Sequence, residues 1–137
     1  MFSVVFIIKY VMDNGKLKKI TNEFLSVLDG AHETLKGLHW SADNHSRHVL
    51  TDDIDHDVLE YQDKIAESVM GLIDDKFSVG ELHALVGDSK EIKGFLNELY
   101  SDVKEYRGKV EEYDAIVNII DDFLTDITKW KYLATLT

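Results

Sequence analysis

One face of a helix expected between about residues 48 and 73 carries five side chains that could bind a metal ion: His48, Asp52, His56, Asp63 and Glu67. Imidazole nitrogens and carboxylate oxygens are common ligands of transition metals. Asp63 and Glu67 are four residues apart, so their carboxylates are neighbours and could hold the same ion. The chain has no cysteine, which excludes thiolate metal sites and disulfides. Any metal site is therefore built from nitrogen and oxygen atoms.

The same face carries Leu59, Ala66 and Met70 among the carboxylates. A surface that met only water would have no reason to hold such apolar residues, so we expect this face to pack against a second subunit. His48 precedes Asp63 by 15 residues, or about 22 Å along a helix, which is too far for the two to share an ion within one chain. An antiparallel copy of the helix across a two-fold axis would bring its own Asp63 and Glu67 level with His48. The spacing thus predicts ligands from two chains.

Four stretches with apolar residues at helical spacing are expected to position these side chains, and they begin near residues 16, 48, 92 and 113. The absence of proline also favours long helices. At 137 residues, the chain is expected to be a single domain, with a bundle at 15–136 and an N-terminal extension at 1–14. The predicted core comprises Phe24, Leu28, Ala31, Leu35, Leu38, Ile54, Val58, Tyr61, Ile65, Val69, Leu72, Ile92, Leu96, Leu99, Val103, Tyr106, Tyr113, Ile116, Ile120, Phe123, Ile127, Trp130 and Ala134.

The connection between the second and third helices, at about residues 74–87, is long enough for a crossover. Ser78 and Glu81 have the spacing of a capping box, which predicts a short helix at about residues 82–86. Asp88 and Glu91 have the same spacing and predict the start of the third helix. The sequence therefore predicts an all-α four-helix bundle with a long crossover that contains a short helix.

The formal net charge of -11 argues against a surface that binds the phosphates of DNA, and it favours cations as partners. The apolar run from Phe2 to Met12 has no basic residue before it, contains Lys9, and is too short to span a bilayer. We interpret it as a strand, a helical extension or the result of a misplaced start codon rather than as a signal peptide. A cytoplasmic protein without membrane association is expected.

Three segments follow a recognisable pattern: Leu38-His39-Trp40, His48 followed four residues later by Asp52, and Asp63-Lys64-Ile65-Ala66-Glu67. Together they resemble the LHW element, the His-x-x-x-Asp helix start and the D-x-I-A-E segment of the Dps mini-ferritins, which belong to the ferritin-like superfamily. Residues 126–133 also resemble the closing helix of that family. The resemblance covers about residues 16–136.

This resemblance implies a ferritin-like bundle with a ferroxidase site shared between subunits. His39, His48 and Asp52 of one subunit would meet Asp63 and Glu67 of the dyad-related one. The resemblance further implies that the site oxidises Fe(II) to Fe(III) with peroxide or oxygen. Twelve copies would form a hollow dodecamer that stores the ferric mineral and so detoxifies iron.

Some positions depart from the family pattern or leave alternatives open. The connection from His39 to His48 is a few residues shorter than is usual in the family, which leaves His45 as an alternative to His48. His56 is either an auxiliary ligand or a hydrogen-bonding residue at the interface, and a polar contact at the dimer interface is expected for His32. A lysine-rich tail is missing, so no direct binding to DNA is expected. The acids of the fourth helix are interpreted as solvated positions, with an ion entry pore as the alternative: Asp114, Asp121, Asp122 and Asp126.

Two other classes of function are compatible with the sequence. A non-catalytic ferritin-like assembly would keep the fold and bind metal only passively, and kinetics of Fe(II) oxidation would distinguish it from a ferroxidase. A helical partner-binding module would stay monomeric and bind no iron.

Overall fold

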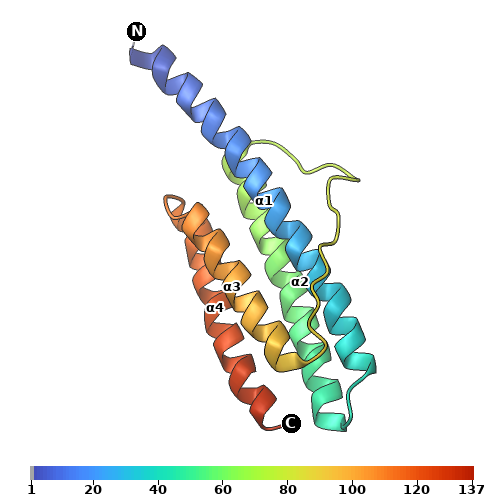
Figure 1. Cartoon of the computed structure of the whole chain (residues 1–137). Helices are drawn as coiled ribbons and strands as arrows, with labels where there is room; N and C mark the ends of the chain where they lie inside the picture. The colour runs from blue at the N-terminus through green and yellow to red at the C-terminus, as the bar shows by residue number, and fades with distance from the viewer. Residues whose placement is uncertain (1) are drawn as a thin grey trace.

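The computed structural model describes the backbone of residues 2–137 and the side chains of residues 14–137. It contains four helices (Figure 1): α1 (Phe2–Trp40), α2 (His45–Ile73), α3 (Ile92–Lys109) and α4 (Asp114–Thr135). No strand occurs in residues 2–137, and the predicted all-α four-helix bundle is confirmed. The prediction of an N-terminal extension falls mainly on residues 1–13, whose side chains lie outside the described part of the chain.

The order of the helices in space requires one long connection. Figure 1 shows that α1 and α2 run in opposite directions, as do α3 and α4, whereas α2 and α3 run in the same direction. The chain must therefore return along the bundle between α2 and α3, and residues 74–91, called the crossover below, do this. The predicted crossover is confirmed.

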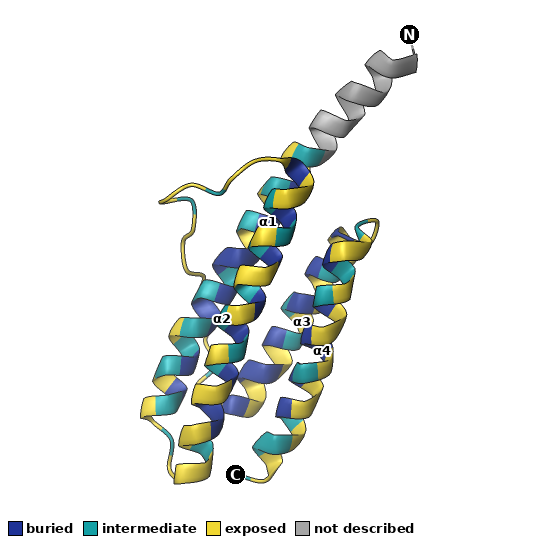
Figure 2. Cartoon of the chain, turned by 180° about the vertical axis from the view of Figure 1, so that it is seen from behind, coloured by how far each residue is buried: buried dark blue, intermediate teal, exposed yellow. Residues whose placement is uncertain are grey.

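All four helices contribute to one apolar core, which follows the predicted stripes (Figure 2). Every core residue predicted for α1 and α3 is buried. In α2 the prediction of Leu72 is wrong, because its side chain is 38% exposed and Ile73 is buried instead. At about 100° per residue, Ile73 lies only about 40° from the core residue Val69 around the helix, whereas Leu72 lies about 60° away on the other side. In α4 the two terminal positions, Tyr113 and Ala134, are only partly buried.

Aromatic rings join the helices in two pairs. The ring of Phe24 in α1 stacks on Tyr106 of α3 with centroids 4.1 Å apart, and Tyr61 of α2 stacks on Phe123 of α4 at 4.3 Å. The buried hydroxyl groups of Thr21 and Tyr106 share a hydrogen bond of 2.8 Å. Tyr106 thus keeps its polar atom satisfied inside the core.

The crossover contains no helix, so the short helix predicted at residues 82–86 is wrong. An extended chain finds its hydrogen-bond partners on α1 instead: the N–H of Leu85 donates to the Ser26 carbonyl at 3.1 Å, and Asn22 Nδ2 donates to the Glu81 carbonyl at 3.1 Å. Gly30 permits this approach, because a Cβ there would lie 1.9 Å from the Leu85 carbonyl oxygen. Asn22, Ser26 and Gly30 are spaced by four residues, so one stripe of α1 holds the crossover.

The starts of α2 and α3 differ in their capping. Asn44 caps α2 by accepting a hydrogen bond from the Arg47 N–H at 2.9 Å. Glu91 is the N-cap of α3, but its side chain makes no capping hydrogen bond, and Asp88 lies within the crossover. The predicted capping box is therefore not formed. None of the helices in the described residues is long and apolar enough to cross a bilayer.

Candidate metal centre

His39 and His48 pack against each other where α1 ends and α2 begins. Their rings stack with centroids 3.7 Å apart and an interplanar angle of 20°. His39 Nδ1 lies 2.6 Å from the His48 carbonyl oxygen, and His48 Nδ1 lies 2.8 Å from the His39 carbonyl oxygen. The two residues therefore hold each other through two reciprocal hydrogen bonds and a ring stack.

These hydrogen bonds determine which nitrogen of each ring can bind a metal. A carbonyl oxygen only accepts, so Nδ1 of each ring must carry the proton and donate it. In the neutral ring, Nε2 then keeps its lone pair, which is the state a metal ligand needs. Histidines that bind metals commonly donate their other N–H to a backbone carbonyl in this way. The backbone thus prepares two imidazole ligands.

The local sequence explains why the two histidines meet. α1 ends at Trp40, residues 41–43 form the turn, and the Asn44 cap then starts α2. His48 then lies in the first turns of α2, opposite the last turn of α1. Thr51, about one turn after His48 in α2, contacts both histidines. Its Oγ1 lies 3.4 Å from His39 Nδ1 and donates a hydrogen bond of 3.0 Å to the His48 carbonyl oxygen. His45, by contrast, is exposed at the first position of α2.

The three predicted carboxylate ligands are exposed on α2. Asp52 follows His48 by one helical turn. Asp63 and Glu67 lie further along the same helix, about 22 Å and about 28 Å beyond His48 at about 1.5 Å per residue. Among the side chains of residues 14–137, no three His, Asp or Glu groups converge on one point. The structure of one chain brings His39 and His48 together and leaves Asp63 and Glu67 apart from them.

The face of α2 between these groups contains both polar and apolar side chains. Leu59, Ala66 and Met70 are only partly buried, and His56 is exposed. His32 was expected at a dimer interface, but it pairs within the chain: its Nδ1 lies 2.7 Å and 2.9 Å from the two carboxylate oxygens of Asp55. This pair links α1 to α2. Asp55 was not among the residues singled out in the sequence, because a partner 23 residues away gives no local signal.

Two acids of α4, Asp121 and Asp126, have side-chain partners that the sequence did not reveal. Asp126 accepts a hydrogen bond from the hydroxyl of Tyr61. The pKa of the Tyr61 phenol is raised, chiefly by burial and next by this hydrogen bond. Asp121 pairs with Arg107 at 2.6 Å, and the hydrogen bond lowers the pKa of the Asp121 carboxyl. The pKa of Asp57 is raised, chiefly by its burial and next by the nearby negative charge of Asp126. Asp126 is thus not simply solvated.

The sequence profile of DUF5856, described as a family of unknown function, matches residues 39–133. The chain belongs to DUF5856. The range matched in this DUF5856 protein begins at His39 and includes His48 and the three carboxylates discussed above. No curated protein matches its sequence.

Among solved structures, the DUF5856 chain is similar to a mutant of Dps1 from Mycobacterium smegmatis. The TM-score is 0.68 with 18% sequence identity, and the match covers 93% of this chain and 96% of the Dps1 chain. At this level of identity the similarity shows a shared fold. The DUF5856 protein therefore has a Dps-like, ferritin-like fold.

Proposed function

We propose that this protein is a Dps-like ferroxidase that binds Fe(II) between two subunits, oxidises it with peroxide or oxygen, and stores the ferric product. The observation that carries the proposal is the reciprocal pairing of His39 and His48, which leaves Nε2 of each ring free to bind metal. The Dps-like fold of the chain also supports the proposal. Iron is the substrate and the cargo of this site.

The donor atoms fit ferrous iron. Imidazole nitrogens suit Fe(II), and carboxylates suit the harder ferric product. His39, His48 and Asp52 would hold the ion from one subunit. Since few donors come from this chain, positions on the ion stay open for the oxidant and for a second subunit. Two ferrous ions give one electron each to one peroxide molecule, whose O–O bond breaks, and with two protons two water molecules form.

The remaining ligands would come from Asp63 and Glu67 of a second copy. Both carboxylates are exposed, and neither can reach the histidine pair of its own chain. The partly buried Leu59 and Met70 lie on the same face, where an antiparallel copy of α2 would cover them. Two-fold symmetry would then make two equivalent sites for each dimer. Six such dimers would form the proposed dodecameric cage, within which residues 15–136 act as a single domain.

A subunit-mixing experiment tests the shared site directly. His39→Ala and Asp63→Ala each remove a ligand from every site of a homodimer, so each variant alone is expected to lose Fe(II) oxidation. Equal co-assembly of the two gives heterodimers with one intact and one doubly altered site. About one quarter of all sites, and of the wild-type rate, should therefore return.

Two outcomes would contradict the proposal. The absence of any rescue in verified heterodimers would show that the ligands are not shared. Full activity in both single variants would show that these residues do not bind the substrate. Asp53→Ala is the matched control, because Asp53 is exposed beside Asp52 but lies on another face of α2. Native mass spectrometry on each sample reports whether a dimer or a dodecamer forms.

A further inference from the structure

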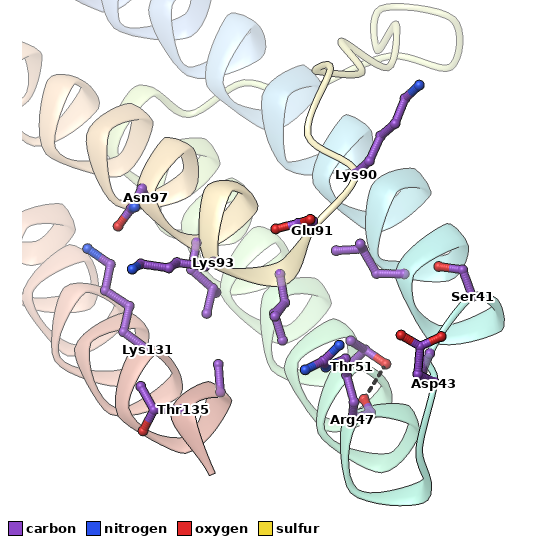
Figure 3. A pocket seen from close by; sticks show the side chains of 15 residues that line it. Ser41, Asp43, Arg47, Thr51, Lys90, Glu91, Lys93, Asn97, Lys131 and Thr135 are labelled. Carbon is purple, nitrogen blue, oxygen red and sulfur yellow. Dashed lines mark hydrogen bonds between the residues drawn. The ribbon is translucent and has the colours of Figure 1, made fainter. Parts of the chain in front are cut away.

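A cavity of about 690 Å³ opens at the end of the bundle where the C-terminus lies. It is enclosed by the end of α1, the start of α2, the start of α3 and the end of α4 (Figure 3). We call it the end pocket, and the lining residues used here are Leu38, Arg47, Thr51, Ile92, Lys93 and Lys131. Its volume is typical of sites for small molecules.

The charge of the end pocket differs from that of the rest of the chain. Arg47, Lys90, Lys93 and Lys131 line it, with only Asp43 and Glu91 as acids, although the whole chain carries a net charge of -11. None of the ion pairs in the described residues involves any of these four cations. The Lys131 ammonium lies over the ring of Tyr100, 4.4 Å from its centroid. Positive charge is thus concentrated here without internal compensation.

The two acids of the end pocket lie at different places, and Figure 3 shows the Glu91 carboxylate at the start of α3, near Lys93. Figure 3 shows Asp43 on the turn before α2, whereas Lys93 and Lys131 extend on the side of α3 and α4. The guanidinium of Arg47 points toward α4, where its Nε lies 3.4 Å from Thr137 Oγ1. Lys90 extends away from the other labelled side chains. Lys93 and Lys131 would therefore face an anion in the end pocket from the side of α3 and α4, and Arg47 from the side of α2.

Two further features complement an anion that carries an apolar body. α3 begins at the end pocket without a side-chain cap, so the N–H groups of its first turn have no side-chain acceptor from Glu91. Such N–H groups favour phosphate oxygens. Leu38, Ile92 and Leu96 give the wall an apolar surface. A ligand that contacted both the first turn of α3 and the apolar wall would combine a phosphate group with a carbon framework.

We propose that the end pocket binds a small organic phosphate, whose phosphate group is attracted by the cations Arg47, Lys93 and Lys131 that line the pocket. This inference does not depend on iron oxidation. Thr51 both lines the end pocket and contacts His39 Nδ1, so the pocket lies behind the histidine pair rather than within it. Binding can be measured with the iron-free assembly.

Isothermal titration of the full-length protein with adenosine 5′-monophosphate, inorganic phosphate and adenosine tests the proposal. The monophosphate is expected to bind more tightly than either fragment, and its affinity should fall as salt is added. Arg47→Gln and Lys131→Gln should each weaken it by about tenfold, because each removes a charged hydrogen-bond donor. Lys129→Gln is the matched control, since Lys129 is exposed on α4 and does not line the end pocket.

Other outcomes would overturn the proposal. Equal affinity for inorganic phosphate would show that the carbon framework is not recognised, and equal affinity for adenosine would show that the phosphate is not. If the monophosphate did not bind, or if Lys129→Gln weakened its binding as much as Arg47→Gln, the end pocket would not be the binding site. Circular dichroism and native mass verify that each variant is folded. If Arg47→Gln is not folded, Lys93→Gln, at an exposed position, takes its place with the same expected loss.

Discussion

His39 and His48 fix each other's tautomer, because the Nδ1 of each ring lies within 2.8 Å of the other residue's carbonyl oxygen and only Nδ1 can donate there. The contact also joins α1 to α2, since each hydrogen bond connects the two helices. The same pair therefore supports the fold at the end of α1 and presents two nitrogen ligands. Substitutions here should change both stability and metal binding.

His48→Ala should lower the free energy of unfolding by about 1–2 kcal/mol, because it removes the hydrogen bond from Nδ1 to the His39 carbonyl oxygen and the ring stack on His39. Urea denaturation at neutral pH measures this loss. His45→Ala is the matched control: His45 is exposed three residues earlier, and its replacement should change stability by less than about 0.5 kcal/mol. Equal losses in the two variants would contradict a specific role for the His39–His48 contact.

Zn(II), a redox-inert probe that accepts the same donors, should raise the melting temperature of the wild type. At about 100 times its dissociation constant, a ligand specific for the folded state adds about 2.7 kcal/mol of stability. Glu67→Ala should abolish most of this gain, and a chelator should reverse it in the wild type. Glu112→Ala is the control, since Glu112 is exposed in the turn between α3 and α4, outside α2. A full gain in Glu67→Ala would exclude Glu67 as a ligand.

Gly30→Ala should destabilise the protein by about 1–3 kcal/mol, because the added Cβ would overlap the Leu85 carbonyl, a backbone atom that can move only with the crossover. Hydrogen exchange at the Leu85 amide should accelerate as its bond to Ser26 is lost. Gly37→Ala is the matched control on the same helix: nothing lies within 4 Å of the added Cβ. It should gain up to about 1 kcal/mol from helix propensity. Similar effects in both would show that the crossover does not pack closely on Gly30.

Tyr106 should make stability depend on pH in the alkaline range. Burial raises the pKa of its phenol from 10.0 to about 12. The folded state therefore holds the phenolic proton more tightly than the unfolded state, and this contribution is complete below pH 10. As pH rises from about 10 to 12, the unfolded state loses its proton first, and about 2–3 kcal/mol of stability is lost.

Urea denaturation at a series of pH values tests this sign. Tyr106→Phe should show a shallower loss of stability above pH 10 than the wild type. At neutral pH it should be about 1 kcal/mol less stable, because the Thr21 hydroxyl loses its partner. Tyr132→Phe, at an exposed position on α4, should keep the wild-type slope. An unchanged slope in Tyr106→Phe would contradict the prediction.

The predicted core residues show how much of the core a local sequence pattern can predict. Leu28, Ile65, Leu96 and Ile127 were assigned from helical periodicity alone, and all four are buried. Periodicity succeeds here because each long helix repeats its buried stripe many times, so a single uncertain position does not change the orientation. Periodicity fails at the end of α2. Leu72 and Ile73 both lie near the buried stripe there, and no further helical residues follow to show which of the two faces the core.

The crossover shows where local signals mislead. Ser78 and Glu81 have the spacing of a helix start, yet the chain there makes only one turn and the residues after it form no helix, because α1 offers the Ser26 carbonyl, the Asn22 amide and the space above Gly30. A short helix gains little from its own hydrogen bonds. Contacts with a helix more than fifty residues earlier in the chain therefore determined its conformation.

The sequence by itself determined the four helices, their buried faces and the types of the candidate metal ligands, because all three follow from spacing along a single helix. Only the tertiary structure decided that His39 stacks on His48, that His32 pairs with Asp55, and that cations gather around the end pocket. These relationships depend on how separate helices lie against each other. That arrangement results from packing of the whole core, which no local stretch of sequence specifies.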